Sequence, residues 1–351
     1  MNILIKNWWN NIDQFNFIAI ISLLIIGTLL SFSINDSFFL IQKHLFYAMF
    51  SIFIILYLSF LKPKTIRRLA LLGLVITSLL MIIVLLMSYE VNGAKRWIKI
   101  SSLSIQPSEF LKPFFLIISA WFLSKGIENK KISLYIVFSS FLFLTTLLIL
   151  QPDFGMTMLF AISFFCQLFI AGLSLSFIII SIFLLILLSL FSYFMFDHVQ
   201  LRVEMFFDSN VSYQISKSLN AFKSGGLFGK GPGQGILKEK LPEAHTDFIF
   251  AVAGEELGFV VCCIIVLLFL LIIIRTLLKL LQIQNSYIII AIIGLTSSFG
   301  LQALINILCA IDLIPTTGMT LPFISYGGSS MLATAILFGF LLSLTKKTLN
   351  E

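Results

Sequence analysis

Long runs of apolar residues alternate with short polar segments along most of this chain. Runs such as 17–30 and 260–274 are almost continuously apolar, whereas the strands of a transmembrane barrel would alternate polar and apolar positions. Only helices and closed barrels span a bilayer, so the pattern predicts an all-α, polytopic integral membrane protein. We predict ten transmembrane helices, at about 17–33, 41–61, 69–88, 107–124, 132–150, 155–172, 175–196, 246–273, 286–310 and 323–345.

The composition supports this class. Hydrophobic residues make up 59% of the 351 residues and charged residues only 11%, which is too apolar for a soluble domain. No segment has the composition of a linker or a soluble domain. We therefore predict one transmembrane domain over 1–351, with a large extracytoplasmic loop at about 197–245. The four cysteines lie in apolar segments without CxxC spacing, so neither disulfides nor metal ligands are expected.

The distribution of basic residues predicts the topology. If the N-terminus is cytoplasmic, the short inner segments hold twelve Lys and Arg residues and the short outer loops hold four. Because basic residues concentrate in cytoplasmic loops, both termini are predicted to be cytoplasmic. The inner residues are Lys6, Lys62, Lys64, Arg67, Arg68, Lys125, Lys130, Lys131, Arg275, Lys279, Lys346 and Lys347, and the outer ones are Lys43, Lys95, Arg96 and Lys99. No basic stripe with interleaved aromatic residues suggests a nucleic-acid partner.

In this topology four helices begin at the outer face with polar residues. The polar segments are 106–109, 151–155, 245–247 and 315–330. Helix N-termini carry unpaired N–H groups and a partial positive charge, so together with the basic loop 93–97 they favour an anionic ligand such as a phosphate. A plainer interpretation remains open, because Pro107 with Glu109 is ordinary helix-start chemistry and Trp97 an ordinary interfacial anchor.

Lys112 is not explained by helix-start chemistry. It lies three residues after Glu109 inside the apolar run and is followed by Pro113, which removes a helical hydrogen bond. Ionisable groups within a membrane usually pair and line a cavity. The pattern therefore predicts a Glu109–Lys112 pair at a kink, with Glu109 holding Lys112 in place.

The segment 241–258, LPEAHTDFIFAVAGEELG, contains the strongest candidate for a reactive carboxylate. On a helix, Asp247, Ala251, Gly254 and Gly258 would share one face, so the acid would stand above a stripe of small residues that a neighbouring helix or a ligand can approach. A packing face with an interfacial Asp is the alternative. Glu255 is close enough to this stripe to face the cavity, but Glu256 has no assigned role.

Two glycine-containing segments complete the set of motifs. The run 224–233 is not a phosphate-binding P-loop, because Gly231 follows Lys230 where a Ser or Thr would bind magnesium, so a re-entrant or surface loop is expected. The run 318–330 places Pro322 and three glycines around a helix start, which predicts irregular backbone. Such backbone is tolerated at membrane depth when it lines a cavity.

Several ordered motifs together resemble the shape, elongation, division and sporulation family over nearly the whole chain. They are NGAKRWI at 92–98, QPSEFLK at 106–112, QPDFG at 151–155, SGGLFGKGPGQG at 224–235, LPEAHTDFIFAVAGEELG at 241–258 and PTTGMTLPFISYGGSS at 315–330. The resemblance implies a ten-helix peptidoglycan glycosyltransferase that polymerises lipid II, with the aspartate of the HTDF run, Asp247, as the catalytic residue. The motifs resemble division-type members more than elongation-type members, although Thr317 stands where division-type members frequently carry Lys.

The resemblance also implies partners and a location. Asp247 is expected to act as general base on a sugar hydroxyl, and undecaprenyl pyrophosphate leaves. Arg96, Lys112, Lys238 or Lys240 are candidates to neutralise the pyrophosphate, alone or with Mg or Mn, and a class B penicillin-binding protein is the expected partner at the division septum of the inner membrane, with the active site facing the periplasm. The full set of candidate substrate-binding residues is Arg96, Glu109, Lys112, Asp153, Lys238, Lys240, His245, Thr246, Ser325 and Gly327. A lipid II flippase, an elongation-type polymerase and a scaffold for division proteins remain as alternatives.

Overall fold

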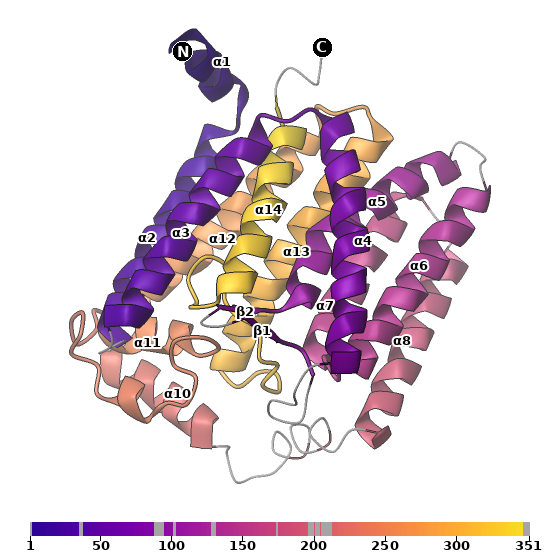
Figure 1. Cartoon of the computed structure of the whole chain (residues 1–351). Helices are drawn as coiled ribbons and strands as arrows, with labels where there is room; N and C mark the ends of the chain where they lie inside the picture. The colour runs from indigo at the N-terminus through magenta and orange to yellow at the C-terminus, as the bar shows by residue number, and fades with distance from the viewer. Residues whose placement is uncertain are drawn as a thin grey trace.

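The computed structural model describes residues 2–34, 38–87, 95–100, 103–127, 131–172, 175–195, 200, 204 and 213–346. The chain forms a bundle of helices that run roughly side by side (Figure 1). The helices are α1 (Asn2–Asn11), α2 (Gln14–Ile34), α3 (Phe38–Ser59), α4 (Pro63–Met87), α5 (Pro107–Ile127), α6 (Lys131–Leu150), α7 (Phe154–Ile170), α8 (Leu175–Met195), α10 (Tyr213–Gly225), the 3-10 helix η1 (Leu237–Lys240), α11 (Ile249–Glu256), α12 (Gly258–Leu280), α13 (Ser286–Ala310) and α14 (Gly328–Leu344). Two short strands, β1 (Ile98–Ile100) and β2 (Leu103–Ile105), form an antiparallel hairpin.

The helices have the lengths and surfaces of membrane-spanning segments. Within the described part of the chain, six of them are long and apolar enough to cross a bilayer, namely α2, α3, α4, α6, α12 and α13. Phe46, Phe50 and Phe53 of α3 stack on one another and remain largely exposed, as a lipid-facing surface requires. The prediction of an all-α membrane protein is confirmed.

The centre of the bundle is formed by α5, α13 and α14. Helix α14 packs on α3 and α5, and α13 packs on α5 and α7. A buried Gln167 of α7 joins three of these helices, because its side chain bonds to Ser119 of α5 and to the carbonyl of Ile290 of α13. It fits only because Gly294 has no side chain, since a Cβ there would lie 2.2 Å from the Gln167 amide nitrogen. Small residues and interhelical hydrogen bonds of this kind hold membrane helices together.

One predicted helix, 246–273, is divided in two. Helix α11 ends at Glu256, and Gly258 begins α12 with a φ of +82°, a conformation that favours glycine. The backbone of segment 224–235, the glycine-rich loop, lies close to this break. A Cβ on Gly258 would lie 2.3 Å from the backbone nitrogen of Gly229. The expected stripe is therefore interrupted: Asp247 lies in a turn before α11, and Gly258 lies beyond the break. A neighbouring helix does pack against Gly254, since the ring of Phe222 on α10 lies against it.

The polar helix starts gather at one end of the bundle. The N-termini of α5, α7, α11 and α14 point to the end that carries α10, while α1 and the last turn of α14 lie at the opposite end (Figure 1). The β1–β2 hairpin, which the sequence did not predict, joins Arg96 and Trp97 to the start of α5. Of the predicted basic loop, residues 93 and 94 lie outside the described residues.

Candidate active site

A cavity of about 260 Å³ lies where the four polar helix starts meet. Six of the predicted site residues line it: Arg96, Glu109, Asp153, Thr246, Asp247 and Gly327. The other lining residues are Trp97, Gln106, Met156, Glu243, Gly318, Met319, Thr320, Tyr326, Ser329 and Ser330. Residues from all four polar segments thus line one cavity.

Gln106 ties three helix starts together. Its backbone N–H donates to Ser329 Oγ at 3.0 Å, at the start of α14. Its side-chain amide donates to Ser108 Oγ at 3.0 Å on α5 and to Asp153 Oδ2 at 3.1 Å before α7. One residue thus fixes the relative positions of α5, α7 and α14 at the mouth of the cavity.

Asp153 and Arg96 form a charged pair on the cavity wall. Asp153 caps α7 by accepting from the N–H of Met156, and its carboxylate lies 3.5 Å from the Arg96 guanidinium. Arg96 also donates to the carbonyls of Gln151 and Pro152. Since the guanidinium is anchored by two backbone carbonyls and one carboxylate, it is held at the cavity, with a side chain that is 17% exposed.

The predicted Glu109–Lys112 pair exists and is buried. Lys112 Nζ lies 2.7 Å from Glu109 Oε2 and donates a second bond of 2.7 Å to Gln302 Oε1 on α13. The Gln302 amide in turn donates to Ser330 Oγ and to the Thr320 carbonyl. Lys112 therefore stands behind the cavity, where it links α5 to α13 and to the start of α14, and Glu109 alone of the pair lines the cavity.

Asp247 is positioned by contacts to its backbone and to its neighbours. Asn306 of α13 donates from its side-chain amide to the Asp247 carbonyl at 2.8 Å and to the Met319 carbonyl at 2.6 Å. Ser325 Oγ donates to the Thr246 carbonyl at 2.5 Å. These hydrogen bonds join the turn that carries Asp247 to the irregular segment before α14 and to α13, and so fix the position of its backbone.

The residues around Asp247 are also fixed. The N–H of Tyr326 donates to the His245 carbonyl at 2.8 Å, and Thr246 Oγ1 donates to Glu243 Oε2 at 2.9 Å. Burial lowers the pKa of the His245 imidazole below its ordinary value, against an opposing effect of Glu243. His245 and Ser325 therefore shape the turn from outside the cavity, whereas Thr246 and Glu243 line it.

Glu255 and Glu256 are buried and hold the glycine-rich loop instead of facing the cavity. Glu255 accepts from the N–H groups of Ile236 and Leu237 and from Lys230 Nζ at 2.9 Å. Glu256 accepts from Lys238 Nζ at 2.8 Å. It also accepts from Ser33 Oγ and from the N–H groups of Gly233 and Gly235. This arrangement gives Glu256 the role that the sequence did not assign.

Two candidate substrate-binding cations, Lys238 and Lys240, therefore lie away from the cavity. Lys238 is engaged with Glu256 and with the Ser33 carbonyl, and Lys240 is exposed at the end of η1. Neither lines the cavity. Arg96 is the only Lys or Arg among the described lining residues, beside the carboxylates of Glu109, Asp153, Glu243 and Asp247. Sequence reasoning did not single out Glu243, Gln302, Asn306 or Tyr326, although polar residues inside an apolar run such as 286–310 are themselves a signal.

The fit of a divalent cation can be judged from the same side chains. Among the described residues, no three His, Cys, Asp or Glu side chains come together as a set of metal ligands. Glu109 is engaged by Lys112 and Asp153 by Arg96. The residues present do not form a ready protein site for Mg or Mn, and we assign no step of the reaction to a metal.

A second cavity of about 350 Å³ adjoins the first and is almost entirely apolar. The two cavities share Arg96, Asp153 and Met319. The remaining lining residues are Pro152, Phe154, Gly155, Met158, Ile162, Ile305, Ile314, Pro315, Thr316 and Thr317. A polar chamber and an apolar chamber thus meet at the Arg96–Asp153 pair, an arrangement that suits a ligand with both a polar and an apolar part.

Comparisons with known proteins agree with this geometry. The family profile described as "Cell cycle protein", which carries the names FtsW, RodA and SpoVE, matches residues 3–350. A probable peptidoglycan glycosyltransferase FtsW of Caulobacter vibrioides is 37% identical over 97% of this chain and 90% of its own length. The corresponding FtsW of Borreliella burgdorferi is 37% identical over 90% of this chain and 88% of its own length. A peptidoglycan glycosyltransferase RodA of Mycobacterium tuberculosis is 34% identical over 72% of this chain and 58% of its own length.

Solved structures show the same fold. The rod shape determining protein RodA of Thermus thermophilus superposes with a TM-score of 0.72 at 25% identity, covering 96% of this chain and 97% of that one. A chain from a structure described as "Structural coordination of polymerization and crosslinking by a peptidoglycan synthase complex" has a TM-score of 0.77 at 25% identity, covering 95% and 97%. The protein therefore belongs to the shape, elongation, division and sporulation family, and it is more similar to these FtsW proteins than to the mycobacterial RodA.

Proposed function

We propose that this protein is a division-type peptidoglycan glycosyltransferase that polymerises lipid II into glycan strands at the septum. The observation that carries the proposal is the pair of adjoining cavities: a polar one with Asp247 on its wall and an apolar one that shares Arg96 and Asp153 with it. Lipid II has the matching parts, a disaccharide peptide and an undecaprenyl chain joined by a pyrophosphate. The similarity to relatives named as probable peptidoglycan glycosyltransferases supports the same activity.

Asp247 acts as the general base in this proposal. Its carboxylate accepts the proton of the 4-hydroxyl on the N-acetylglucosamine of the acceptor. The hydroxyl oxygen then bonds to the anomeric carbon of the donor's N-acetylmuramic acid as the bond from that carbon to the pyrophosphate oxygen breaks, with inversion, and undecaprenyl pyrophosphate leaves. A positioned base contributes about 10²–10⁴-fold to such a step.

Arg96 is placed to stabilise the leaving pyrophosphate. It stands at the junction of the two cavities, where the link between sugar and lipid would lie, and two backbone carbonyls and Asp153 hold its guanidinium. A fixed cation aimed at developing negative charge needs no reorganisation during the reaction. Lys112 acts indirectly, since it positions Glu109 and Gln302 from behind the cavity.

The proposal includes a topology of ten spans with both termini in the cytoplasm. The start of α2 and the last turn of α14 lie at the same end of the bundle (Figure 1), as an even number of spans requires. The site would then open toward the periplasm, beside the segment at about 197–245, where lipid-linked substrate arrives within the outer leaflet. A class B penicillin-binding protein is the proposed partner. This is supported by the similar fold of a chain from a structure that describes polymerisation and crosslinking by a peptidoglycan synthase complex.

A flippase of the same lipid is less well supported. Transporters tend to place broken helices and charges near the middle of the membrane. Here the charged residues that line the cavity lie at or before the first turns of α5, α7 and α11.

The proposal is tested with the purified full chain and its partner, given labelled lipid II and scored for glycan chains. Asp247→Asn should lower the rate by at least about 10²-fold. The matched control is Asp312→Asn, which makes the same change just after α13 at a residue that does not line the cavity, and it should keep the wild-type rate. An Asp247→Asn variant that polymerises as fast as wild type would overturn the assignment.

A further inference from the structure

A large basic pocket lies at the other end of the bundle from the active-site cavity. Its volume is about 990 Å³, and it is formed by the start of α4, the end of α5 and the start of α13. Trp121 on its wall is twelve residues along α5 from Glu109, a separation of about 18 Å at the helical rise per residue. The lining residues are Lys62, Pro63, Lys64, Arg67, Trp121, Ser124, Lys125, Asn285, Ser286, Tyr287 and Ile288.

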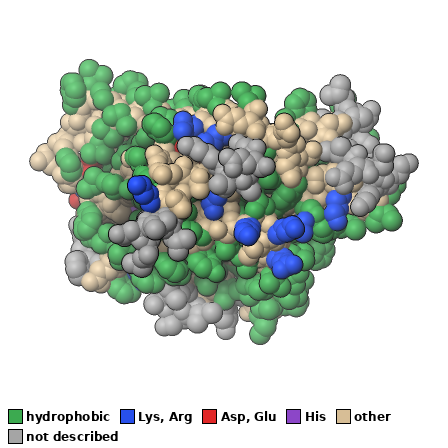
Figure 2. Space-filling view, turned by 90° about the horizontal axis from the view of Figure 1, so that it is seen from above, with side chains coloured by type: hydrophobic (Ala, Val, Ile, Leu, Met, Phe, Trp, Pro, Cys, Tyr) green, Lys and Arg blue, Asp and Glu red, His purple; other side chains and the backbone are tan. Residues whose placement is uncertain are grey.

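The charge of this pocket is one-sided. Four of its described lining residues are cations, Lys62, Lys64, Arg67 and Lys125, and none is an acid. None of the four forms an ion pair with a described carboxylate. Figure 2, which looks onto this end of the molecule, shows Lys and Arg side chains spread across it. Clustered cations with no acid among them attract an anion.

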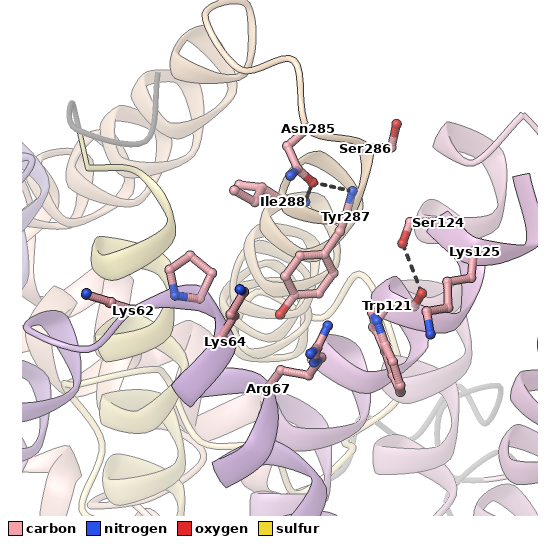
Figure 3. Close-up of a pocket in the computed structure, with 11 residues that line it drawn as sticks. Lys62, Lys64, Arg67, Trp121, Ser124, Lys125, Asn285, Ser286, Tyr287 and Ile288 are labelled. Carbon is pink, nitrogen blue, oxygen red and sulfur yellow. Dashed lines mark hydrogen bonds between the residues drawn. The ribbon is translucent and has the colours of Figure 1, made fainter. Parts of the chain in front are cut away.

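Two of the cations, Arg67 and Lys125, are held in place around an aromatic residue. Trp121 carries the Arg67 guanidinium 4.5 Å from its ring centroid and the Lys125 ammonium at 4.1 Å. Figure 3 shows Arg67 between the rings of Tyr287 and Trp121. Cation–π contacts of this kind hold the charges without neutralising them, so they remain available to a ligand.

A polar atom in the pocket lacks a hydrogen-bond partner. The Tyr287 hydroxyl is buried and makes no hydrogen bond in the described part of the chain. Buried polar groups are nearly always paired, so this unpaired donor beside Arg67 leaves a hydrogen bond for a bound anion to complete. The side chain of Asn285, in contrast, is occupied, because it caps α13 by accepting from the N–H groups of Tyr287 and Ile288.

The apolar surface next to the pocket identifies the kind of anion. Arg67 is followed at i+4 and i+8 by Leu71 and Val75, which share its helix face and are 47% and 51% exposed. The basic pocket is thus continuous with a surface that suits acyl chains. Basic pockets between transmembrane helices with this arrangement bind the headgroups of anionic lipids.

From these observations we propose that the pocket bounded by α4, α5 and α13 binds the phosphate headgroup of an anionic phospholipid in the leaflet opposite the active site. The phosphate lies among Lys64, Arg67 and Lys125 and accepts from the Tyr287 hydroxyl. One acyl chain runs down α4 along Leu71 and Val75. This site is separate from the proposed polymerase reaction and does not depend on it.

The test is native mass spectrometry of the detergent-purified full chain titrated with phosphatidylglycerol, with phosphatidylcholine as the neutral lipid. The wild type should retain phosphatidylglycerol preferentially. Arg67→Gln should weaken that binding about fivefold, the effect of removing about 1 kcal/mol for one cation near a membrane surface. Lys64→Gln should act in the same direction. Because Lys64 is exposed, this variant separates binding from folding.

Arg68→Gln is the matched control, since Arg68 is the next residue, equally charged, exposed and outside the pocket. It should keep wild-type binding. An equal loss in Arg67→Gln and Arg68→Gln would overturn the site, because it would mean only diffuse surface charge. Equal retention of phosphatidylcholine by the wild type would overturn it too. Full competition by soluble glycerol 3-phosphate at the lipid's own concentration would overturn the lipid assignment in favour of a free phosphate.

Discussion

The buried Lys112 offers a prediction whose magnitude can be worked from the structure. Its ammonium is 2.7 Å from Glu109 Oε2 and 2.7 Å from Gln302 Oε1, and Lys112 as a whole is 3% exposed. At an effective dielectric constant of about 20, the Coulomb attraction across 2.7 Å is about 6 kcal/mol before the cost of desolvation. Removing one partner leaves a buried carboxylate unpaired, which typically costs about 3–5 kcal/mol. Lys112→Ala should therefore lower the free energy of unfolding by about 3–5 kcal/mol.

A double-mutant cycle isolates the pair. Glu109→Gln and Lys112→Met should each destabilise the protein, whereas the double variant should recover much of the loss, because replacing both members of a buried pair is often close to neutral. The measurement is unfolding in mixed micelles at pH 7, with polymerisation assayed in parallel. Lys112→Arg, which keeps the charge, should retain part of the activity that Lys112→Ala loses. Single-variant costs below about 1 kcal/mol that simply add would refute the claim that Glu109 and Lys112 form a coupled buried pair.

Two further predictions concern the loops around the site. Glu256→Gln should weaken the bonds from Glu256 to Lys238 and to the glycine-rich loop, and so speed tryptic cleavage in 229–240. Glu239→Gln changes an exposed residue in the same segment and should not speed cleavage. Equal cleavage of both variants would refute the claim that Glu256 holds this loop. For His245, burial lowers the folded-state pKa below the ordinary value of 6.5, so the unfolded state takes up the proton first as the pH falls. Stability should be complete above about pH 6.5 and decline below it toward the folded-state pKa, and thermal unfolding of His245→Gln should show a smaller decline; an unchanged slope would contradict the reasoning.

Much of the fold could be predicted from hydrophobic runs. Nine of the ten predicted ranges each overlap one helix, and 246–273 overlaps two, because a bilayer forces the backbone to satisfy its own hydrogen bonds and so leaves few alternatives. The count of basic residues predicted the topology, and the topology placed the polar helix starts at the same face of the membrane. The Glu109–Lys112 pair followed from the cost of an unpaired charge in an apolar run.

The missed features depend on contacts between distant segments. The break at Gly258 arises because the backbone of the glycine-rich loop approaches it, and nothing in the local sequence indicates that contact. Glu255 and Glu256 face this loop, not the cavity, and Lys230, Leu237 and Lys238, which bind them, lie 18 to 25 residues earlier in the chain. The ion pair with Glu256 also holds Lys238 away from the cavity. Asn306 is missed for a similar reason, since its partners are the backbone carbonyls of Asp247 and Met319.

The central claim is that the Asp247 carboxylate takes part in the chemical step and does more than bind or pack. The most direct test measures lipid II affinity and single-turnover polymerisation for wild type and Asp247→Asn side by side. Because Asn keeps the shape of Asp and the support comes from the backbone contacts of Asn306 and Ser325, we predict nearly unchanged affinity and a turnover rate lower by at least about 10²-fold. Wild-type turnover, or a loss explained entirely by weaker binding, would contradict the account.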